Sequence, residues 1–300
     1  MTRFLSIVFL LVALTVNAAA QTRGTAGNGC DRECLRGMIT QYLDSLVAHD
    51  PKRLPTAPHV KFTEGTKTTQ LGEGLWKTAS KIRSYRQDFL DVREGQAASH
   101  VVVEENGTPV MLALRLKVAD RKVTEIETMV VRGGSQNRTT ALNAMTAPRP
   151  LWNIVPEAAQ KMSRADLIRI AEYYPAGLKV GGTFEAVDAP FAPGAYRIEN
   201  AGLMAGPGAR AGSENIKTQR IIAHPDLTYR VAAVDEELGI VLLRMDFGDT
   251  NSYGPGNALT VMEIFKVFGG QIHAVEAFME VMPRNTPSGW DDRYEVKKPK

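Results

Sequence analysis

Apolar residues recur at helical intervals near the start of each half of the chain. The first stretch predicts a helix over residues 31–48 that ends at the "HDP" sequence of 49–51. Its apolar positions are Leu35, Met38, Ile39, Tyr42, Leu43 and Leu46. A second helix is predicted from Ser163, which forms a capping-box signal with Asp166, and Pro175 is expected to kink or end it. The buried stripe of this second helix is Leu167, Ile170, Ala171 and Tyr174.

Strand-like segments follow each predicted helix. In the second half they run from 196 to 282. Because a leading helix followed by a mainly antiparallel sheet is typical of the α+β class, we expect that class for the whole chain. The strand-like segments of the first half are "VKFTE" (60–64), a region near 82–92, "SHVVVEE" (99–105), "VMLALRLKV" (110–118) and "KVTEIETMVV" (122–131).

Two segments of the first half return in the same order in the second half. Residues 116–131 align with 265–280, and both are typical of a strand, a tight turn and another strand. Residues 57–65 align with 189–200. Two similarities in one order indicate a tandem repeat. We therefore expect a signal peptide (1–20), a first domain (30–133), a linker (134–160), a second domain (161–284) and a tail (285–300).

The start of the chain is typical of a secretory signal. Arg3 precedes the apolar run "FLSIVFLLVALTV", and small residues up to Ala20 provide a cleavage site. We therefore expect a secreted or periplasmic protein that has no membrane segment after signal cleavage. The net charge of +3 comes from 36 basic and 33 acidic residues without a concentrated patch, so nucleic acid is not an expected partner.

The chain has two cysteines, Cys30 and Cys34. In an exported protein a disulfide between them is the natural first interpretation, and it requires Cys30 to lie just before the helix. The five histidines show no metal-ligand spacing, so we expect no metal site. Nucleotide-binding and serine-hydrolase fingerprints are also missing from the sequence, so we expect no cofactor.

The order of helix, short acid-tipped strand and long hairpins resembles the SnoaL-like and ketosteroid isomerase-like branch of the nuclear transport factor two-like superfamily. The second half is also similar to an exported family with an unassigned domain. The resemblance implies two tandem cone-shaped units, each a helix wrapped by a curved antiparallel sheet around an apolar pocket. The segments that carry it are "YLDSLVAHD" (42–50), "VKFTEG" (60–65), "DRKVTEIETMVV" (120–131), "RIENAG" (197–202), "VDEELGIVLLRMDF" (234–247) and "VEAFMEVMPRNTPSGW" (275–290).

The resemblance also implies a proton-transfer site. Tyr42 takes the place of the helix tyrosine that donates to the developing oxyanion, and Glu64 that of the carboxylate that moves the proton. A carboxylate among apolar side chains has a raised pKa, which makes it an effective proton shuttle. Glu199 aligns with Glu64 and is the candidate base of the second half.

One position departs from the isomerase pattern. The second oxyanion donor of that family is a protonated acid on a later strand, and its place falls near Ala113, which cannot donate a hydrogen bond. In the second half the corresponding region holds Met262 and Glu263. Glu263 aligns with Leu114, an apolar-face position, so it points into the second pocket unless the register differs by one residue.

Several candidate residues have a structural interpretation beside the functional one. Tyr42 is either a pocket donor or a core tyrosine, and Glu64 is either a pocket acid or a solvated strand end. Trp76 is either a pocket lid that binds substrate or a packing anchor. Arg197, a candidate for substrate binding with Glu263, shares a strand face with Glu199, and the two form an ion pair under the structural interpretation.

The equivalent glutamates Glu127 and Glu276 on the closing strands also have two interpretations. They either line the cone or lie at an interface or in an outer ion pair, and the second interpretation is favoured because buried carboxylates without partners are rare.

The leading functional expectation is an exported, cofactor-independent acid/base enzyme, an isomerase or a lyase such as a dehydratase. Its expected substrate is a small apolar or aromatic carbonyl or hydroxyl compound. The alternative is a non-catalytic protein that binds a small molecule or uses its sheet faces for assembly, including assembly into a homo-oligomer.

Overall fold

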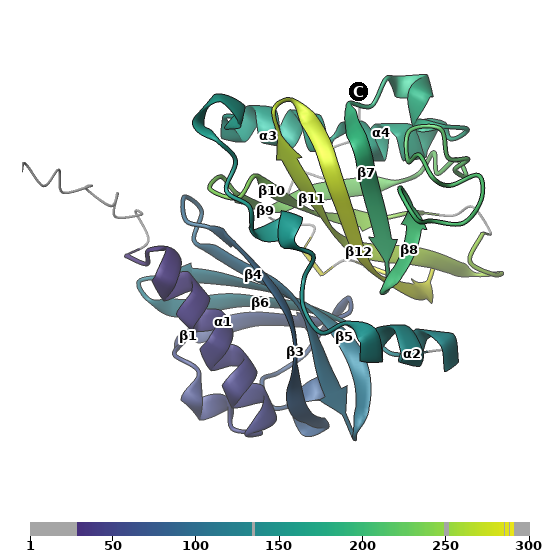
Figure 1. Cartoon of the computed structure of the whole chain (residues 1–300). Helices are drawn as coiled ribbons and strands as arrows, with labels where there is room; N and C mark the ends of the chain where they lie inside the picture. The colour runs from purple at the N-terminus through teal and green to yellow at the C-terminus, as the bar shows by residue number, and fades with distance from the viewer. Residues whose placement is uncertain (1–28, 134–135, 249–251, 285, 288, 291–300) are drawn as a thin grey trace, which may run out of the picture.

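The computed structural model describes residues 29–133, 136–248, 252–284, 286–287 and 289–290. The described residues are mostly β, with 44% strand and 22% helix, and the strands form two six-stranded sheets (Figure 1). The prediction of an α+β fold built from two cone-shaped helix-plus-sheet units is therefore wrong. The predicted signal peptide lies outside the described residues.

The first sheet precedes the second along the chain, and helices are short apart from the first. The first sheet contains β1 (Thr56–Glu64), β2 (Lys67–Thr68), β3 (Ala79–Asp91), β4 (Gln96–Glu105), β5 (Thr108–Ala119) and β6 (Lys122–Val131). The second contains β7 (Phe191–Glu199), β8 (Gly202–Ala205), β9 (Thr228–Asp235), β10 (Ile240–Asp246), β11 (Asn257–Phe268) and β12 (Gln271–Pro283). The α-helices are α1 (Arg32–Val47), α2 (Gln136–Ala144), α3 (Arg164–Ala171) and α4 (Tyr173–Val180). The 3-10 helices are η1 (Pro51–Arg53), η2 (Gly74–Lys77), η3 (Pro150–Asn153), η4 (Ala158–Gln160) and η5 (Phe184–Val187).

The two sheets share one topology. Their strand orders are β2-β1-β6-β5-β4-β3 and β8-β7-β12-β11-β10-β9. Each contains one parallel pair, β1 with β6 and β7 with β12, among antiparallel neighbours. The hairpins β5–β6 and β11–β12 turn through Asp120-Arg121 and Gly269-Gly270, all at positive φ, as favoured two-residue turns require. The sequence repeat therefore corresponds to a repeated sheet.

The helices begin where their capping residues indicate. The carboxylate of Asp31 accepts the backbone N–H of Cys34 at the start of α1. The second predicted helix is divided into α3 and α4, and Pro175 is the third residue of α4. First-turn N–H groups lack a partner within a helix, so the proline fits there and the break falls upstream of it. None of the described helices is long and apolar enough to cross a membrane.

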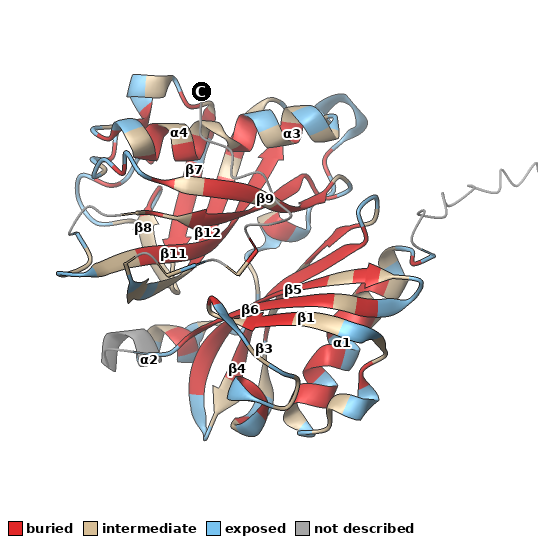
Figure 2. Ribbon diagram, turned by 180° about the vertical axis from the view of Figure 1, so that it is seen from behind, coloured by how far each residue is buried: buried red, intermediate tan, exposed pale blue. Residues whose placement is uncertain are grey.

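Both faces of each sheet are covered by protein. Figures 1 and 2 show α1 on the outer face of the first sheet and α3 and α4 on that of the second. Between the inner faces lies an apolar cluster that includes Val102 and Met111 of the first sheet and Leu242 and Phe278 of the second. Because the central strands are apolar on both sides, the sheets pack on each other instead of closing into separate cones.

Reciprocal arginines join the two halves. Arg32 at the start of α1 forms a bidentate pair with Asp235 at 2.8 Å, and Arg164 at the start of α3 forms one with Asp91. Each aspartate also accepts, at 2.8 Å, the backbone N–H of the residue that precedes the other aspartate. These buried, charge-assisted hydrogen bonds fix the ends of β3 and β9 against each other.

Glu127 is buried at the interface between the sheets. It binds Arg115 of its own sheet at 2.8 Å, and Arg230 of the second sheet, while Arg244 lies 3.6 Å away. Burial alone would raise the pKa of Glu127, but the three guanidinium groups lower that pKa to about 2. Glu127 is therefore an ionised interface residue, which agrees with the interpretation favoured from the sequence.

The equivalent Glu276 is also buried at this interface. Its carboxylate accepts the Tyr85 hydroxyl at 2.6 Å and contacts His100 Nδ1 at 2.9 Å, both from the first sheet. Each closing strand thus sends a glutamate across to the other sheet. These polar contacts fix how the two sheets are aligned within a largely apolar interface.

The end of the chain contributes to the core. Trp290, in the predicted tail (285–300), is 1% exposed, and its indole N–H donates to Thr63 Oγ1 at 2.9 Å. The Lys61 ammonium lies 4.4 Å from the ring centroid and the Arg115 guanidinium 4.6 Å. The predicted linker (134–160) is likewise structured, since it contains α2, η3 and η4.

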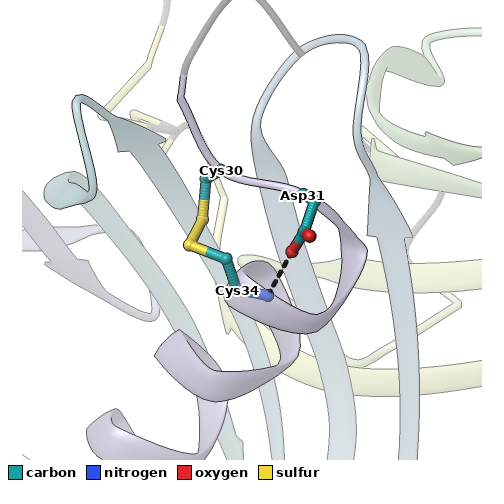
Figure 3. The surroundings of a disulfide bond; sticks show 3 residues. All are labelled: Cys30, Asp31 and Cys34. Atoms are coloured by element: carbon teal, nitrogen blue, oxygen red, sulfur yellow. Dashed lines mark hydrogen bonds between the residues drawn. A yellow bond between two sulfur atoms is a disulfide. The ribbon is translucent and has the colours of Figure 1, made fainter. Parts of the chain in front are cut away.

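The two cysteines form a disulfide at the start of α1 (Figure 3). Cys30 precedes the N-cap residue Asp31, so its Cα lies 5.2 Å from that of Cys34, within the range that a disulfide spans. The bond fixes the segment that leads into α1.

Candidate active site in the second half

Two glutamates of the second sheet lie in one row on its helix-covered face. Glu263 on β11 is opposite Ala277 on β12, which is opposite Glu199 on β7. Opposed residues share a face, and Ala277 packs in the cluster that contains Tyr174 of α4, so both carboxyl groups point toward the helices. Two strand spacings, about 10 Å, separate their Cα atoms.

Arg197 connects this row to the helix. It lies two residues before Glu199 on β7, and its Nη1 donates to the Tyr174 hydroxyl at 3.1 Å while Nη2 donates to Gln219 Oε1 at 2.8 Å. Its Nε is 2.9 Å from Glu199 Oε1, an ion-pair contact without an aligned hydrogen bond. Burial lowers the pKa of Arg197, but Tyr174 and Glu199 raise it above its ordinary value, so the guanidinium remains charged.

Glu263 is a buried acid that holds its proton at neutral pH. Only 2% of the residue is exposed, and burial together with the nearby Glu199 raises its pKa to about 8, although Arg197 opposes the shift. Burial also raises the pKa of Tyr174 well above its usual value. The site therefore presents two neutral hydroxyl groups, a carboxylic acid and a phenol, beside one ion pair.

These residues line a cavity of about 230 Å³. Its polar part includes His224 and Tyr253, which stack with ring centroids 5.9 Å apart. Burial lowers the pKa of His224 to about 4, so the imidazole is neutral, and its Nδ1 is buried without a hydrogen-bond partner in the described part of the chain. Apolar side chains complete the wall, among them Leu178, Phe247, Leu259 and Met279. The cavity combines proton donors with an apolar lining, a composition typical of small-molecule sites.

The first sheet has the same row with different side chains. Leu114 on β5 is opposite Thr128 on β6, which is opposite Glu64 on β1. Leu114 thus takes the place of Glu263, and Phe62 takes the place of Arg197 two residues before the glutamate. Ala113, the position expected for the second donor, lies in the cluster between the sheets and not on this face.

In the first half, Tyr42 and Trp76 pack in the core, and Glu64 holds the 3-10 helix η2 in place. Tyr42 is 1% exposed and packs edge to face on Trp76, with ring centroids 5.3 Å apart. Glu64 accepts the backbone N–H of Leu75 in η2 at 2.9 Å and lies 3.6 Å from the Arg132 guanidinium. Trp76, 1% exposed on η2, is thus a packing anchor, one of its two interpretations.

Gly74 shows how closely η2 approaches Glu64. Its φ is +62°, and a Cβ atom built there would lie 2.6 Å from the Glu64 carboxylate oxygens. The loop therefore covers this carboxylate tightly. A proton-transfer role for Tyr42 and Glu64 stays a prediction.

The structure separates the candidate residues into two groups. Arg197, Glu199 and Glu263 line one cavity, whereas the candidates of the first half lie on the outer face of the other sheet. Sequence reasoning placed Tyr174 on a buried helix stripe without giving it a role in the site. The equal interval from Leu35 to Tyr42 and from Leu167 to Tyr174 is the signal that identifies it. Gln219 and His224 come from the connection between β8 and β9, and Tyr253 comes from that between β10 and β11. Both connections are longer than their first-half counterparts and carried no such signal.

No group of three or more His, Cys, Asp and Glu side chains in the described part of the chain is arranged to hold a metal ion.

Comparison with known proteins covers mainly the second half. A family described as "Domain of unknown function (DUF8021)" matches residues 160–279, a range that includes Tyr174, Arg197, Glu199 and Glu263. No curated protein matches the chain. A de novo designed protein with a curved β-sheet is 19% identical over 38% of this chain and 98% of its own, with a TM-score of 0.30, too low to inform the fold. The SnoaL-like resemblance stays a prediction.

Proposed function

We propose that the protein is an exported acid/base enzyme, an isomerase or lyase, whose active site is the cavity of the second half. Its substrate is a small, partly apolar carbonyl or hydroxyl compound. The observation that carries the proposal is the pair of carboxyl groups in one row, Glu199 ion-paired and Glu263 protonated, at an apolar cavity. Two carboxyl groups held in different protonation states are the equipment of general acid/base catalysis.

Each residue has a role that follows from its contacts. Glu263 donates a hydrogen bond to the substrate oxygen, and burial strengthens this interaction as negative charge develops there. Glu199 removes a proton from the carbon next to the carbonyl group and returns it at a second carbon in an isomerisation. In a dehydration, Glu263 instead protonates the departing hydroxyl group. Arg197 positions Glu199 and compensates its charge, and Tyr174 holds the Arg197 guanidinium through a hydrogen bond.

Proton exchange tests this proposal before the substrate is known. The wild-type protein is incubated in D₂O with a panel of small enolisable ketones and aldehydes, and deuterium incorporation at carbon is followed by NMR. We expect catalysed exchange for part of the panel and a loss of at least about 100-fold in Glu199→Gln and in Glu263→Gln. Glu64→Gln, the same change at the equivalent position of the first half, is the matched control and should retain exchange.

The outcomes separate the alternatives. Loss of exchange in Glu64→Gln with retention in Glu199→Gln would move the active site to the first half. A panel that never exchanges, although folded wild-type protein binds its members, would favour a non-catalytic binding protein.

One contact favours that second candidate, a small-molecule binding protein. Glu199 lies 2.9 Å from the Arg197 guanidinium, so its carboxylate already has a cationic partner within the protein. In this case Arg197 and Glu263 orient a ligand without any reaction. The disulfide near the start of the described chain is compatible with the exported location in either case.

A further inference from the structure

Two arginines stand at the mouth of the second-half cavity. Arg210 and Arg220 line it, and both are exposed, in contrast to the buried Arg197 deeper in the site. They lie on the long connection between β8 and β9. Within the described part of the chain, neither guanidinium forms an ion pair or a side-chain hydrogen bond. Their charge is therefore uncompensated by protein groups.

The charge inside the cavity is otherwise balanced. Arg197 and Glu199 neutralise each other, Glu263 holds its proton, and His224 is a neutral imidazole. The two mouth arginines therefore set the sign of the field at the entrance. A positively charged mouth above low-dielectric walls attracts anions and raises their local concentration.

The remaining surface at the mouth is apolar. Ile222 lines the cavity and is 61% exposed, an unusual exposure for a large aliphatic side chain. A ligand that complements these surfaces places a polar oxygen inside the cavity, an apolar body against the apolar wall and an anionic group at the mouth. The volume of about 230 Å³ restricts it to a small molecule.

We propose that the ligand of the second-half cavity is a small organic acid whose carboxylate lies between Arg210 and Arg220 while its carbonyl or hydroxyl oxygen reaches Glu263. The inference rests on the site of the proposed function and adds the substrate class, an oxo- or hydroxycarboxylate with an apolar body. Guanidinium groups suit a carboxylate because their planar N–H donors match its two oxygens.

The test compares acids with their uncharged amides. Titrations of the full chain with 4-hydroxyphenylacetate, 4-hydroxyphenylacetamide, 5-oxohexanoate and 5-oxohexanamide are followed by protein NMR at low ionic strength. We expect each acid to bind about tenfold more tightly than its amide, and the preference to weaken as salt screens the exposed arginines. In the double variant Arg210→Gln with Arg220→Gln the preference should fall to within about twofold.

A matched control removes the same charge elsewhere. Arg53 and Arg121 are exposed in the first half, and Arg53→Gln with Arg121→Gln should keep the full preference for acids. Equal binding of acids and amides, binding of neither, or an equal loss in the control variant would overturn the inference.

The result is independent of the proposed reaction. In Glu199→Gln, proton exchange should be lost while the preference for acids persists. A preference for acids without any exchange in wild type would leave the ligand class standing and refute the enzyme. Proton exchange without a preference for acids would support the enzyme and refute the ligand class.

Discussion

The outer faces of the two sheets share a framework and differ in their chemistry. Both place a tyrosine on the covering helix and a glutamate at the end of the equivalent strand, β1 or β7. The two outer faces differ at two neighbouring strand positions. Phe62 and Leu114 of the first half correspond to Arg197 and Glu263 of the second. The first set packs as core, whereas the second set lines a cavity.

This difference shows how a duplicated fold can divide its tasks. Buried polar groups cost stability unless they are paired, and a half that holds Arg197 and Glu263 carries that cost. The first half has apolar side chains at both positions and contributes a well-packed sheet against which the second is aligned. Glu127 and Glu276 form hydrogen bonds between the two sheets and so fix how the sheets are aligned.

Converting the apolar row of the first half should have the largest effect. Leu114→Glu places a carboxyl group in a core that provides no Arg197 equivalent, since Phe62 occupies that place. We expect a loss of about 4 kcal/mol in the free energy of unfolding, the usual cost of an uncompensated buried charge. Urea unfolding monitored by circular dichroism measures it.

Leu114→Met is the control, because it preserves apolar volume and should cost less than about 1.5 kcal/mol. If Leu114→Glu were equally mild, the first half would tolerate a site like that of the second, and the division of tasks would fail.

The pH dependence of stability should distinguish the two buried carboxyl groups. The pKa of Glu263 is raised to about 8 in the folded protein, so the folded state holds a proton that the unfolded chain releases near pH 4.5. The contribution of Glu263 to stability is therefore fully present below about pH 4.5 and is lost as pH rises from about 4.5 to 8, by at most about 1.4 kcal/mol for each pH unit. Glu127 acts in the opposite direction, because its pKa of about 2 means that stability is lost as pH falls below about 4.5.

Thermal unfolding across pH 2 to 9 tests this assignment. Glu263→Gln cannot release a proton, so its profile should be flatter on the alkaline side while the acid side is unchanged. An unaltered alkaline side would show that Glu263 is ionised in the folded protein and would remove the acid from the proposed site.

The sequence predicted the order of elements better than their packing. Helix 31–48 and the hairpins at 116–131 and 265–280 follow from local signals, namely apolar periodicity and turn residues with positive φ. How the sheets pack depends on contacts between distant strands. The apolar runs at 101–103 and 110–118 already indicated a different packing. Strands that are apolar on both faces need cover on both sides, and a cone with one open face does not provide it.

The residues of the candidate site were predictable where the second half aligns with the first. The alignment of Leu114 with Glu263 placed that acid on the correct face, since the register of β11 and β12 agrees with it. His224 and Gln219 could not be anticipated, because they come from irregular loops whose course depends on tertiary contacts. The burial that raises the pKa of Glu263 likewise depends on the whole fold.

Replacing Arg197 and Glu263 by their first-half equivalents should remove the site while preserving the fold. In the double variant Arg197→Phe with Glu263→Leu, the cavity row becomes apolar like that of the first half. The double variant removes the buried acid together with the buried guanidinium, so we expect it to be more stable than Arg197→Phe alone and to lose acid binding and proton exchange. Arg197→Phe alone should be the more destabilising change, because it leaves Glu199 without its cation and the buried Glu263 beside a phenyl ring. A double variant less stable than either single variant would contradict the equivalence of the two rows.

The two helix tyrosines provide the smallest contrast. Tyr174→Phe removes the oxygen that accepts a hydrogen bond from Arg197 at 3.1 Å, and a bond to a buried charged donor is worth about 1.5 kcal/mol. Tyr42→Phe keeps the ring that packs on Trp76 and removes only a neutral hydrogen bond between the hydroxyl and Trp76, so we expect it to cost less than about 1 kcal/mol. Urea unfolding of both variants under one condition measures the difference. Equal costs would mean that the Tyr42 hydroxyl is bonded as strongly as that of Tyr174, and the two helix-covered faces would then be more alike than their strands indicate.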